Sequence, residues 1–354
     1  MGRLPPQFYL EVARSDSDPR PQSGPRYSDR VPLLEKKLIQ QIRRSARAAA
    51  RTRGSVVTGI GDDCAVLRLP AGHEMLVTTD FSIENTHFRR DWHTPQSVGR
   101  RCLTRGLSDI AAMGGDPQAA FLSLAVPNDC PLEWIDHFLQ GLLGLAKEFK
   151  ISLAGGDTAA SPDGIMADIV VIGSVPRGKA ILRSGAKVGD RIYVTGDLGH
   201  SAAAIAALRQ THSGWTQCQT FRPQPRVAVG QYLRRHGLAS AMIDLSDGLS
   251  TDLEHICQES HVGAELNAEA IPRARESAGK KRIVLNVALD FALHGGDDYE
   301  LLFTSSAPIP NKIAGVRITQ IGRIKRSAGM RLTAVDGRSR VLEAQGWEHF
   351  TKNL

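Results

Sequence analysis

Apolar residues recur along the chain at two spacings, one typical of helices and one typical of strands. Leu34, Leu38, Ile39 and Ile42 fall on one face of a helix, which we expect to run from Leu34 to about Ala50. Similar patterns predict further helices over residues 97–113, 131–149, 200–209 and 284–294.

Short apolar runs next to glycine or acidic residues predict strands over residues 74–80, 119–126, 151–157, 167–175 and 190–196. Residues 239–260 begin extended, turn at Ser-Asp-Gly and continue as a helix, and residues 295–304 turn into a strand. This alternation favours an α/β fold class with α+β layering, in which helices pack on sheets.

The length of 354 residues favours two domains over one. Residues 1–30 are rich in Pro, Arg, Ser and Asp, so we expect a disordered tail or a start codon placed too far upstream. An N-terminal domain is expected over residues 31–175, and a C-terminal α/β domain over residues 176–354.

Charge and cysteine content narrow the class of protein. A net charge of +7 with a pI near 9.3 fits an ordinary soluble basic protein or one with an anionic ligand. No Lys/Arg stripe is interleaved with aromatic residues, so we expect no nucleic-acid partner. The five cysteines form no CxxC pair, which favours reduced thiols in the cytoplasm. No apolar run suits a membrane span or a signal peptide.

Residues 173–180, GSVPRGKA, nearly match a phosphate-binding P-loop. Ala180 lacks the hydroxyl that the pattern needs for magnesium, and Pro176 has no N–H to offer a phosphate. A turn after an apolar strand is the better interpretation.

Aspartates recur in glycine-flanked turns and at predicted strand ends: Asp62, Asp63, Asp80, Asp109, Asp157, Asp244, Asp247, Asp297 and Asp298. Each alone suits a turn or a helix N-cap. Strand ends gather on one edge of an α/β sheet, where converging carboxylates repel one another unless cations neutralise them. Oxygen ligands without a His/Cys cluster select Mg²⁺ or Mn²⁺. Nearby glycines and hydroxyls, those of Thr78, Thr79 and Ser246, extend this to Mg-nucleotide chemistry.

Nine motifs in order resemble those of thiamine-monophosphate kinases, a family in the aminoimidazole-ribonucleotide synthetase superfamily. They are GIGDDCAV, TTDFSIENTHF, LSDIAAMGGDP, AGGDT, LRSGAKVGD, VTGDLG, MIDLSDGLSTD, GGDDYELLFT and GWEHF, and the resemblance as a whole runs from about residue 31 to 350. The resemblance implies a two-domain fold whose N-terminal sheets pair in a homodimer, with ATP between the domains. It also implies direct transfer of the γ-phosphoryl group to thiamine monophosphate, the last step of thiamine diphosphate biosynthesis, without a phospho-enzyme or a catalytic side chain.

The resemblance assigns roles to matching positions. It implies several Mg²⁺ ions, held by Asp62, Thr78, Thr79, Asp80, Asp109, Asp157, Asp244 and Asp247. It implies ATP contacts at Gly156, Asp157, Arg183 and Ser246. It implies a thiamine-monophosphate pocket at His87, Asp297 and Trp347. From the residues alone, Trp347 equally suits a packed aromatic and His87 suits a polar surface. Asp63 suits either support of the metal ligands or the cap of a turn.

The sequence departs from the family at Asp297, where the family commonly has Glu, and in its N-terminal extension. Three alternatives stay open: another ATP-dependent enzyme of the superfamily, such as selenophosphate synthetase or a hydrogenase-maturation protein; an inactive sensor of thiamine phosphates; and a metal-dependent phosphohydrolase. No cysteine lies in the glycine-rich N-terminal segment expected of selenophosphate synthetase.

Overall fold

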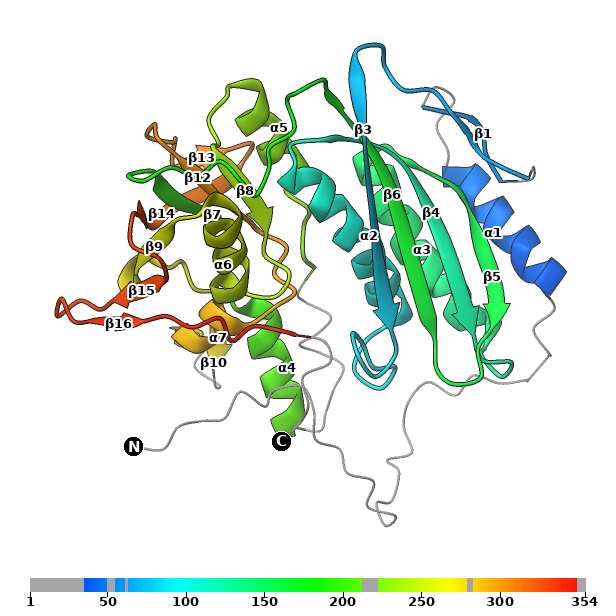
Figure 1. Ribbon diagram of the computed structural model, residues 1–354. Helices are drawn as coiled ribbons and strands as arrows, with labels where there is room; N and C mark the ends of the chain where they lie inside the picture. Colours follow the sequence, from blue (N-terminus) through cyan, green and yellow to red (C-terminus); the bar gives the residue numbers. More distant parts are fainter. Residues whose placement is uncertain (1–34, 50–54, 61–62, 212–221, 279–282, 349–354) are drawn as a thin grey trace.

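The structure is a computed structural model that describes residues 35–49, 55–60, 63–211, 222–278 and 283–348. The expected tail at residues 1–30 and the metal ligand expected at Asp62 lie outside this range. Among the described residues, two large sheets, each with its own helices, lie side by side (Figure 1). Within the described residues, no helix is long and apolar enough to cross a membrane.

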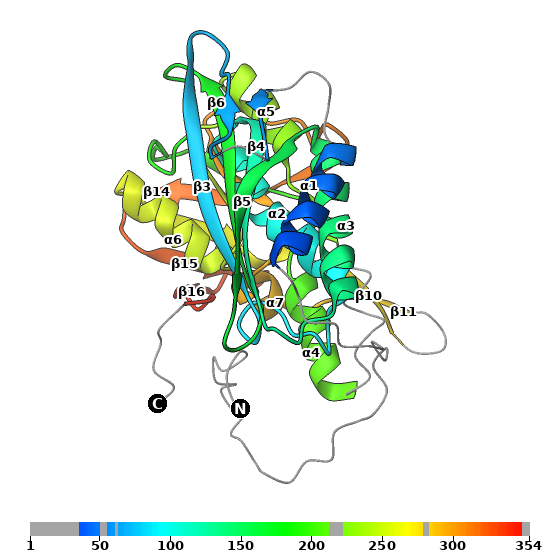
Figure 2. The same ribbon diagram turned by 90° about the vertical axis from the view of Figure 1, so that its right-hand side faces the viewer.

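The first sheet has four strands in the order β3-β6-β4-β5, formed by His73–Ile83, Met166–Pro176, Asp116–Val126 and Ser152–Ala160. Its neighbours are antiparallel except for the parallel pair β4 and β5. Helices α2 (Pro95–Ala112) and α3 (Leu132–Phe149) cover one face, with α1 (Glu35–Ala49) against α3 and β5 (Figures 1 and 2). A short ribbon, β1 (Val56–Thr58) with β2 (Val66–Leu67), precedes the sheet.

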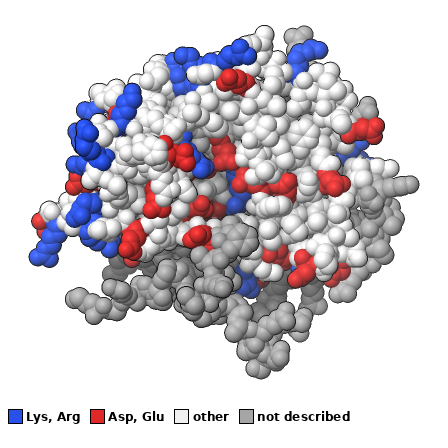
Figure 3. All heavy atoms as spheres, in the orientation of Figure 1, with Lys and Arg blue, Asp and Glu red and all other residues white. Residues whose placement is uncertain are grey.

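The period of two along β3 decides which of its side chains face the helices. Leu76 and Ser82 are buried, whereas Met75, Val77 and Phe81 are all more than half exposed on the other face. In the view of Figure 3 the right-hand part of the molecule, which carries this sheet, is mostly uncharged with interspersed acidic groups. The sheet therefore has a helix-covered face and an open face.

Helices α2 and α3 approach so closely that glycine is needed at their contact. A Cβ atom on Gly99 of α2 would lie 1.9 Å from the carbonyl oxygen of Phe138, and one on Gly141 of α3 would lie 2.0 Å from that of Gln96. Backbone cannot move aside as a side-chain tip can. The two glycines therefore allow α2 and α3 to pack at this short distance.

We expect Gly141→Ala to destabilise the protein by about 1–3 kcal/mol, because overpacking forces the two helix backbones apart. The control is Gly144→Ala, one turn further along α3, where an added Cβ would meet no atom within 4 Å. That change should be neutral or stabilise by up to about 1 kcal/mol, since alanine is the better helix former. Urea unfolding of both variants measures the difference; equal stabilities would contradict the close contact.

The second sheet runs in the order β16-β15-β9-β14-β7-β12-β8, with β13 beside β14. Its strands are β7 (Arg191–Thr195), β8 (Ala241–Asp244), β9 (Gly263–Asn267), β12 (Leu301–Ser305), β13 (Lys312–Ile313), β14 (Val316–Lys325), β15 (Met330–Thr333) and β16 (Ser339–Val341). Every pairing on this path is antiparallel except β9 with β15. The ribbon of β10 (Arg275–Ala278) and β11 (Ile283–Asn286) stands apart.

Four α-helices and a 3₁₀ turn accompany this sheet: α4 (His200–Thr211), α5 (Val227–Arg235), α6 (Leu249–Ser260), α7 (Leu289–His294) and η1 (Ala268–Ala270). Helix α6 contacts β8, β9 and β12, and α5 packs against α2 of the first unit. Because α2 also contacts β8, it touches both sheets.

Most of the expected elements are confirmed within a few residues, and so is the layered α/β class. Residues 173–180 are the end of β6 and a turn, as expected, with the Lys179 N–H donating to Pro176 O. The helix predicted over residues 284–294 is wrong in its first part, since Ile283–Asn286 is a strand and the helix begins at Leu289. The apolar run IVLN suits both conformations, and pairing with β10 decides between them.

Candidate active site

Three of the expected carboxylates meet between the two sheets. Asp80 lies on the helix-facing side of β3, Asp109 lies on α2, and Asp244 ends β8. Asp80 and Asp109 share a side-chain hydrogen bond, and both lie close enough to Asp244 for their charges to interact. The Thr78 hydroxyl donates to Asp109 Oδ2. The site thus draws on residues far apart in the chain.

Burial raises the pKa values of these three carboxylates, and mutual repulsion adds to it at Asp80 and Asp244. Desolvation, followed by the charge of Asp109, raises the pKa of Asp80 to about 8. The same causes raise the pKa of Asp244 to about 7, and desolvation raises the pKa of Asp109. One oxygen, Asp80 Oδ2, is buried without a hydrogen-bond partner among the described residues. An all-oxygen set with such an orphaned acceptor suits a hard divalent cation.

The expectation that these acids sit at strand ends along one sheet edge is wrong in part. Asp80 and Asp157 lie within β3 and β5, and Asp109 lies in a helix; only Asp244 ends its strand. The physical reason is that the first sheet is mainly antiparallel, so its strands do not all end on the same edge. The cluster forms instead where α2, β3 and β8 meet.

Thr79 and Asp157 lie on the open face of the first sheet, away from this cluster. The Thr79 hydroxyl donates to Asp168 Oδ1 over 2.7 Å. Strand register places Phe81, Asp168, Ser123 and Asp157 in one row across the sheet, and Phe81 is exposed on the open face. The structure does not bring these two residues to Asp80, and their metal role stays a prediction.

Three loops of the C-terminal unit converge beside the carboxylates. The Asp297 N–H donates to Ser246 O over 2.8 Å, and the Trp347 N–H donates to Asp247 O over 3.0 Å. The Gly346 N–H donates to Thr251 Oγ1 on α6 over 3.0 Å. The structure therefore brings the predicted nucleotide contact Ser246 and metal contact Asp247 next to the predicted substrate residues Asp297 and Trp347.

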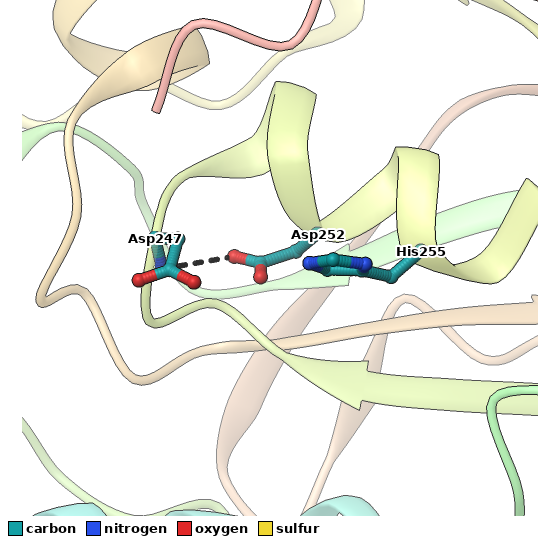
Figure 4. A group of neighbouring side chains, drawn as sticks. All are labelled: Asp247, Asp252 and His255. Atoms are coloured by element: carbon teal, nitrogen blue, oxygen red, sulfur yellow. Dashed lines mark hydrogen bonds between the residues drawn. The ribbon is translucent and has the colours of Figure 1, made fainter. Parts of the chain in front are cut away.

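Asp247 also belongs to a second group of potential ligands, with Asp252 and His255 of α6, whose ligand atoms lie within 4.8 Å of one another (Figure 4). Asp252 is buried, and its Oδ2 accepts the N–H groups of Asp247 and Gly248. These bonds account for Asp252 as the acceptor that holds the loop before α6.

Asp297 is held by two arginines that the sequence motifs did not single out. Its carboxylate accepts from Arg101 over 2.5 Å, from Arg105 over 3.1 Å and from the Tyr299 hydroxyl over 2.6 Å. Although burial opposes it, these charges hold the pKa of Asp297 below its ordinary value. His87 lies near enough to contribute, and its Nδ1 accepts the Ile83 N–H over 3.0 Å.

Arg183, Gly156 and Asp63 complete the predicted set. Arg183 is exposed, yet its charge acts on Asp109 and Asp244. Gly156 lies on β5 with a φ of +145°, where a Cβ would be 1.8 Å from Leu122 O. Asp63 is exposed and follows the residues that the structure does not describe.

The spacing of charged residues in the sequence could have indicated the two arginines. Arg101, Arg105 and Asp109 are four residues apart on α2, and this spacing places them on one helix face. Because Asp109 is a predicted metal ligand, charged residues on its face of the helix are candidates for the same site.

The family follows from two domain matches. "AIR synthase related protein, N-terminal domain" matches residues 61–175, and "AIR synthase related protein, C-terminal domain" matches residues 187–308. Together they cover most of the chain, which belongs to the AIR synthase related family.

Within that family its relatives are thiamine-monophosphate kinases, as the motifs implied. The enzyme of Salmonella typhimurium is 38% identical over 86% of this chain and 96% of its own length. The enzyme of Bacillus subtilis is 34% identical over 84% of this chain and 94% of its own. The chain therefore belongs to the thiamine-monophosphate kinase branch.

Solved structures of thiamine-monophosphate kinases share the fold of this chain. The thiamine-monophosphate kinase of Stenotrophomonas maltophilia superimposes with a TM-score of 0.71 at 34% identity, covering 88% of this chain and 99% of that one. A structure described as AaThiL complexed with AMPPCP and TMP has a TM-score of 0.68 at 29% identity, covering 80% and 89%. The hydrogenase maturation protein HypE of E. coli, 18% identical with a TM-score of 0.66, covers 86% and 96% and shares the fold.

Proposed function

We propose that this protein phosphorylates thiamine monophosphate with ATP, giving thiamine diphosphate and ADP. The observation that carries the proposal is the likeness to thiamine-monophosphate kinases over nearly their whole length, together with the related structure that holds an ATP analogue and TMP. The site agrees, because the carboxylate cluster lies next to the arginine pair that holds Asp297.

The reaction joins two anions, so its demands are positioning and charge neutralisation. An oxygen of the acceptor phosphate forms a bond to the γ-phosphorus, and the bond from that phosphorus to the β,γ-bridging oxygen breaks. The electron pair leaves with ADP. A dianionic acceptor needs no general base, which agrees with the prediction of no catalytic side chain.

The metal proposed for the cluster is Mg²⁺, held by Asp80, Asp109 and Asp244, with Asp247 beside them. The three carboxylates offer oxygen ligands alone, and the orphaned Asp80 Oδ2 also supports this choice. Bound there, Mg²⁺ would supply positive charge to the phosphates of ATP. The roles of Thr78, Thr79, Asp62 and Asp157 in holding further ions, and of Gly156, Arg183 and Ser246 in holding ATP, are parts of the same proposal.

We expect Mg²⁺ to raise the melting temperature more at about pH 8.5 than at about pH 6. Protons occupy Asp80 and Asp244 below their pKa values of about 8 and 7, so Mg²⁺ must displace them there. Without Mg²⁺ these groups favour the folded state at low pH, and that contribution is lost as the pH rises through 7 to 8. Thermal scans with Mg²⁺ and with EDTA measure this. An equal rise at both pH values would contradict the cation site.

The test of function is an end-point assay. The protein is mixed with Mg-ATP and thiamine monophosphate, and the products are separated by chromatography. Equal amounts of thiamine diphosphate and ADP would support the proposal. ADP without thiamine diphosphate would indicate a hydrolase or a sister enzyme, and no turnover would indicate a sensor.

Trp347 is proposed to cover the thiamine ring. We expect Trp347→Ala to raise the KM for thiamine monophosphate about tenfold and to leave the KM for ATP nearly unchanged, because a cation over a tryptophan face contributes up to about 2 kcal/mol. Trp347→Phe should keep most of the affinity. Steady-state kinetics with each substrate varied in turn measure both values; equal effects would mean that Trp347 only packs.

A homodimer that joins the N-terminal sheets is proposed as well. Support comes from β3, an edge strand whose open face exposes Met75, Val77 and Phe81. Apolar side chains grouped in this way are typical of a surface that a partner covers. A cytoplasmic location is part of the proposal, and the described cysteines Cys64, Cys102, Cys130 and Cys257 are all free thiols.

A further inference from the structure

One face of α2 carries a line of charged side chains that runs from the carboxylate cluster to the proposed thiamine pocket. Asp109, Arg105 and Arg101 follow one another at intervals of four residues, which is about 6 Å along the axis. Asp109 belongs to the carboxylate cluster, and Arg101 and Arg105 contact Asp297. Arg105 therefore lies between the expected position of the γ-phosphate and the expected position of the thiamine ring.

Arg105 shares its carboxylate partner with a second arginine. The side chains of Arg101 and Arg105 are only 10% and 14% exposed, and the single carboxylate that both contact is Asp297. Tyr299, whose ring lies 5.9 Å from the Arg105 guanidinium carbon, is a neutral partner. Arg105 thus shares its ion-pair partner with a second buried guanidinium group, and Asp80 is the other carboxylate whose charge acts on it among the described residues. A buried guanidinium group is costly unless anions and acceptors satisfy its charge and its donors.

A donor in this pocket is also unused. Arg105 Nε is buried and makes no hydrogen bond with the described residues. His93, which lies close to Arg101, is likewise buried with its Nε2 unpaired among them. Asp297 occupies only one terminal nitrogen of Arg105, so the planar fork has donors left for a further oxygen.

We propose that Arg105, assisted by Arg101, binds the phosphate of the acceptor substrate and positions it against the γ-phosphate of ATP. This inference rests on the proposed function and specifies the part of the site that recognises the acceptor. A phosphate monoester offers three oxygens, so it can accept from both arginines while Asp297 keeps the Tyr299 hydroxyl. Arginine suits this task because its fork matches phosphate geometry.

The experiment is a cycle that changes both the protein and the ligand. Affinities of thiamine monophosphate and of thiamine, which lacks the phosphate, are measured by calorimetry with Mg²⁺ and a non-hydrolysable ATP analogue. The variants are Arg105→Gln, Arg105→Lys and Arg101→Gln. The control is Arg100→Gln on the same helix, whose guanidinium pairs with Glu148 at 2.8 and 3.0 Å.

We expect the wild type to prefer the phosphorylated ligand, and Arg105→Gln to reduce that preference by about 10- to 100-fold, the effect of losing hydrogen bonds to a charged group. Thiamine affinity should be unchanged, and Arg100→Gln should behave as the wild type. If Arg105 served only to hold Asp297, both ligands would weaken equally and the proposal would fail. Weakening confined to the ATP analogue would overturn it too, by moving the contact to the donor phosphate.

Two further readings keep the test decisive. If Arg105→Gln does not fold, the ratio of the two affinities is measured on Arg105→Lys. This variant keeps the positive charge but loses the planar guanidinium group. A ratio equal to that of the wild type would overturn the proposal. If the wild type binds neither thiamine compound, the proposed function fails and the inference fails with it. If the wild type and the Arg105 variant prefer thiamine monophosphate over thiamine to the same degree, the inference fails and the proposed function stands.

Discussion

Asp244→Asn should reduce turnover by a factor of at least about 1,000, the equivalent of several kcal/mol of lost charge stabilisation. Asp244 is 3% exposed and is the carboxylate that the C-terminal unit adds to Asp80 and Asp109. The amide cannot replace the negative charge that a cation needs. Because burial already disfavours that charge, the variant should be at least as stable as the wild type in the absence of Mg²⁺.

The matched control is Asp190→Asn, another buried aspartate at the start of a strand. Its Oδ2 accepts from the Lys187 N–H over 3.0 Å and from the Ser240 hydroxyl over 2.6 Å. This variant should lose stability and keep its turnover number. Turnover of each variant at saturating Mg-ATP and thermal unfolding of each with EDTA make the comparison. Retained activity in Asp244→Asn would remove Asp244 from the proposed metal set.

Arg226→Met is expected to destabilise the C-terminal unit by about 3–5 kcal/mol, because it leaves an uncompensated buried charge. Glu300 is 6% exposed at its side chain, and Arg226 contacts both of its oxygens, one of them over 2.6 Å. The Thr195 hydroxyl is its other donor among the bonds described. One hydroxyl is too little to stabilise a buried carboxylate.

An exposed ion pair provides the control. Arg317 and Asp197 are also paired, but their side chains are 50% and 47% exposed. Arg317→Met should change stability by at most about 1 kcal/mol, since water replaces the lost partner. Denaturant unfolding measures both variants, and the double variant Arg226→Met with Glu300→Gln should recover part of the loss. A small effect of Arg226→Met would mean that water reaches Glu300.

The fold could be predicted largely from apolar periodicity, and the prediction failed where that periodicity carries too little information. Where the apolar run was long, as in α2 and α3, the helix bounds came within two residues. The short run IVLN was misread because four apolar residues carry too little periodicity to tell strand from helix. Strand direction was also beyond the sequence, since no local pattern distinguishes antiparallel from parallel neighbours in these buried strands.

The sequence predicted the carboxylates of the candidate site but not its arginines. Motifs identified Asp80, Asp109 and Asp244 because each lies in a segment that matches the kinase family. They did not separate Thr78 from Thr79, although the pleat sends one toward Asp109 and the other to Asp168 on the open face. Arg101 and Arg105 were missed because a charged residue on a helix is usually a solvated one, and only the tertiary contact with Asp297 shows otherwise.

Helix α2 touches β3 and β6 on one side and α5 and β8 on the other. The carboxylate cluster and the arginine pair therefore exist only while both hydrophobic cores are assembled and docked on this helix. Opening of either core, even as a brief local fluctuation, would dismantle the site while the other half kept its native hydrogen bonds. Under mild denaturant, catalytic activity should then be lost before hydrogen exchange reports global unfolding. The contact between the two units would be the first part of the enzyme to open.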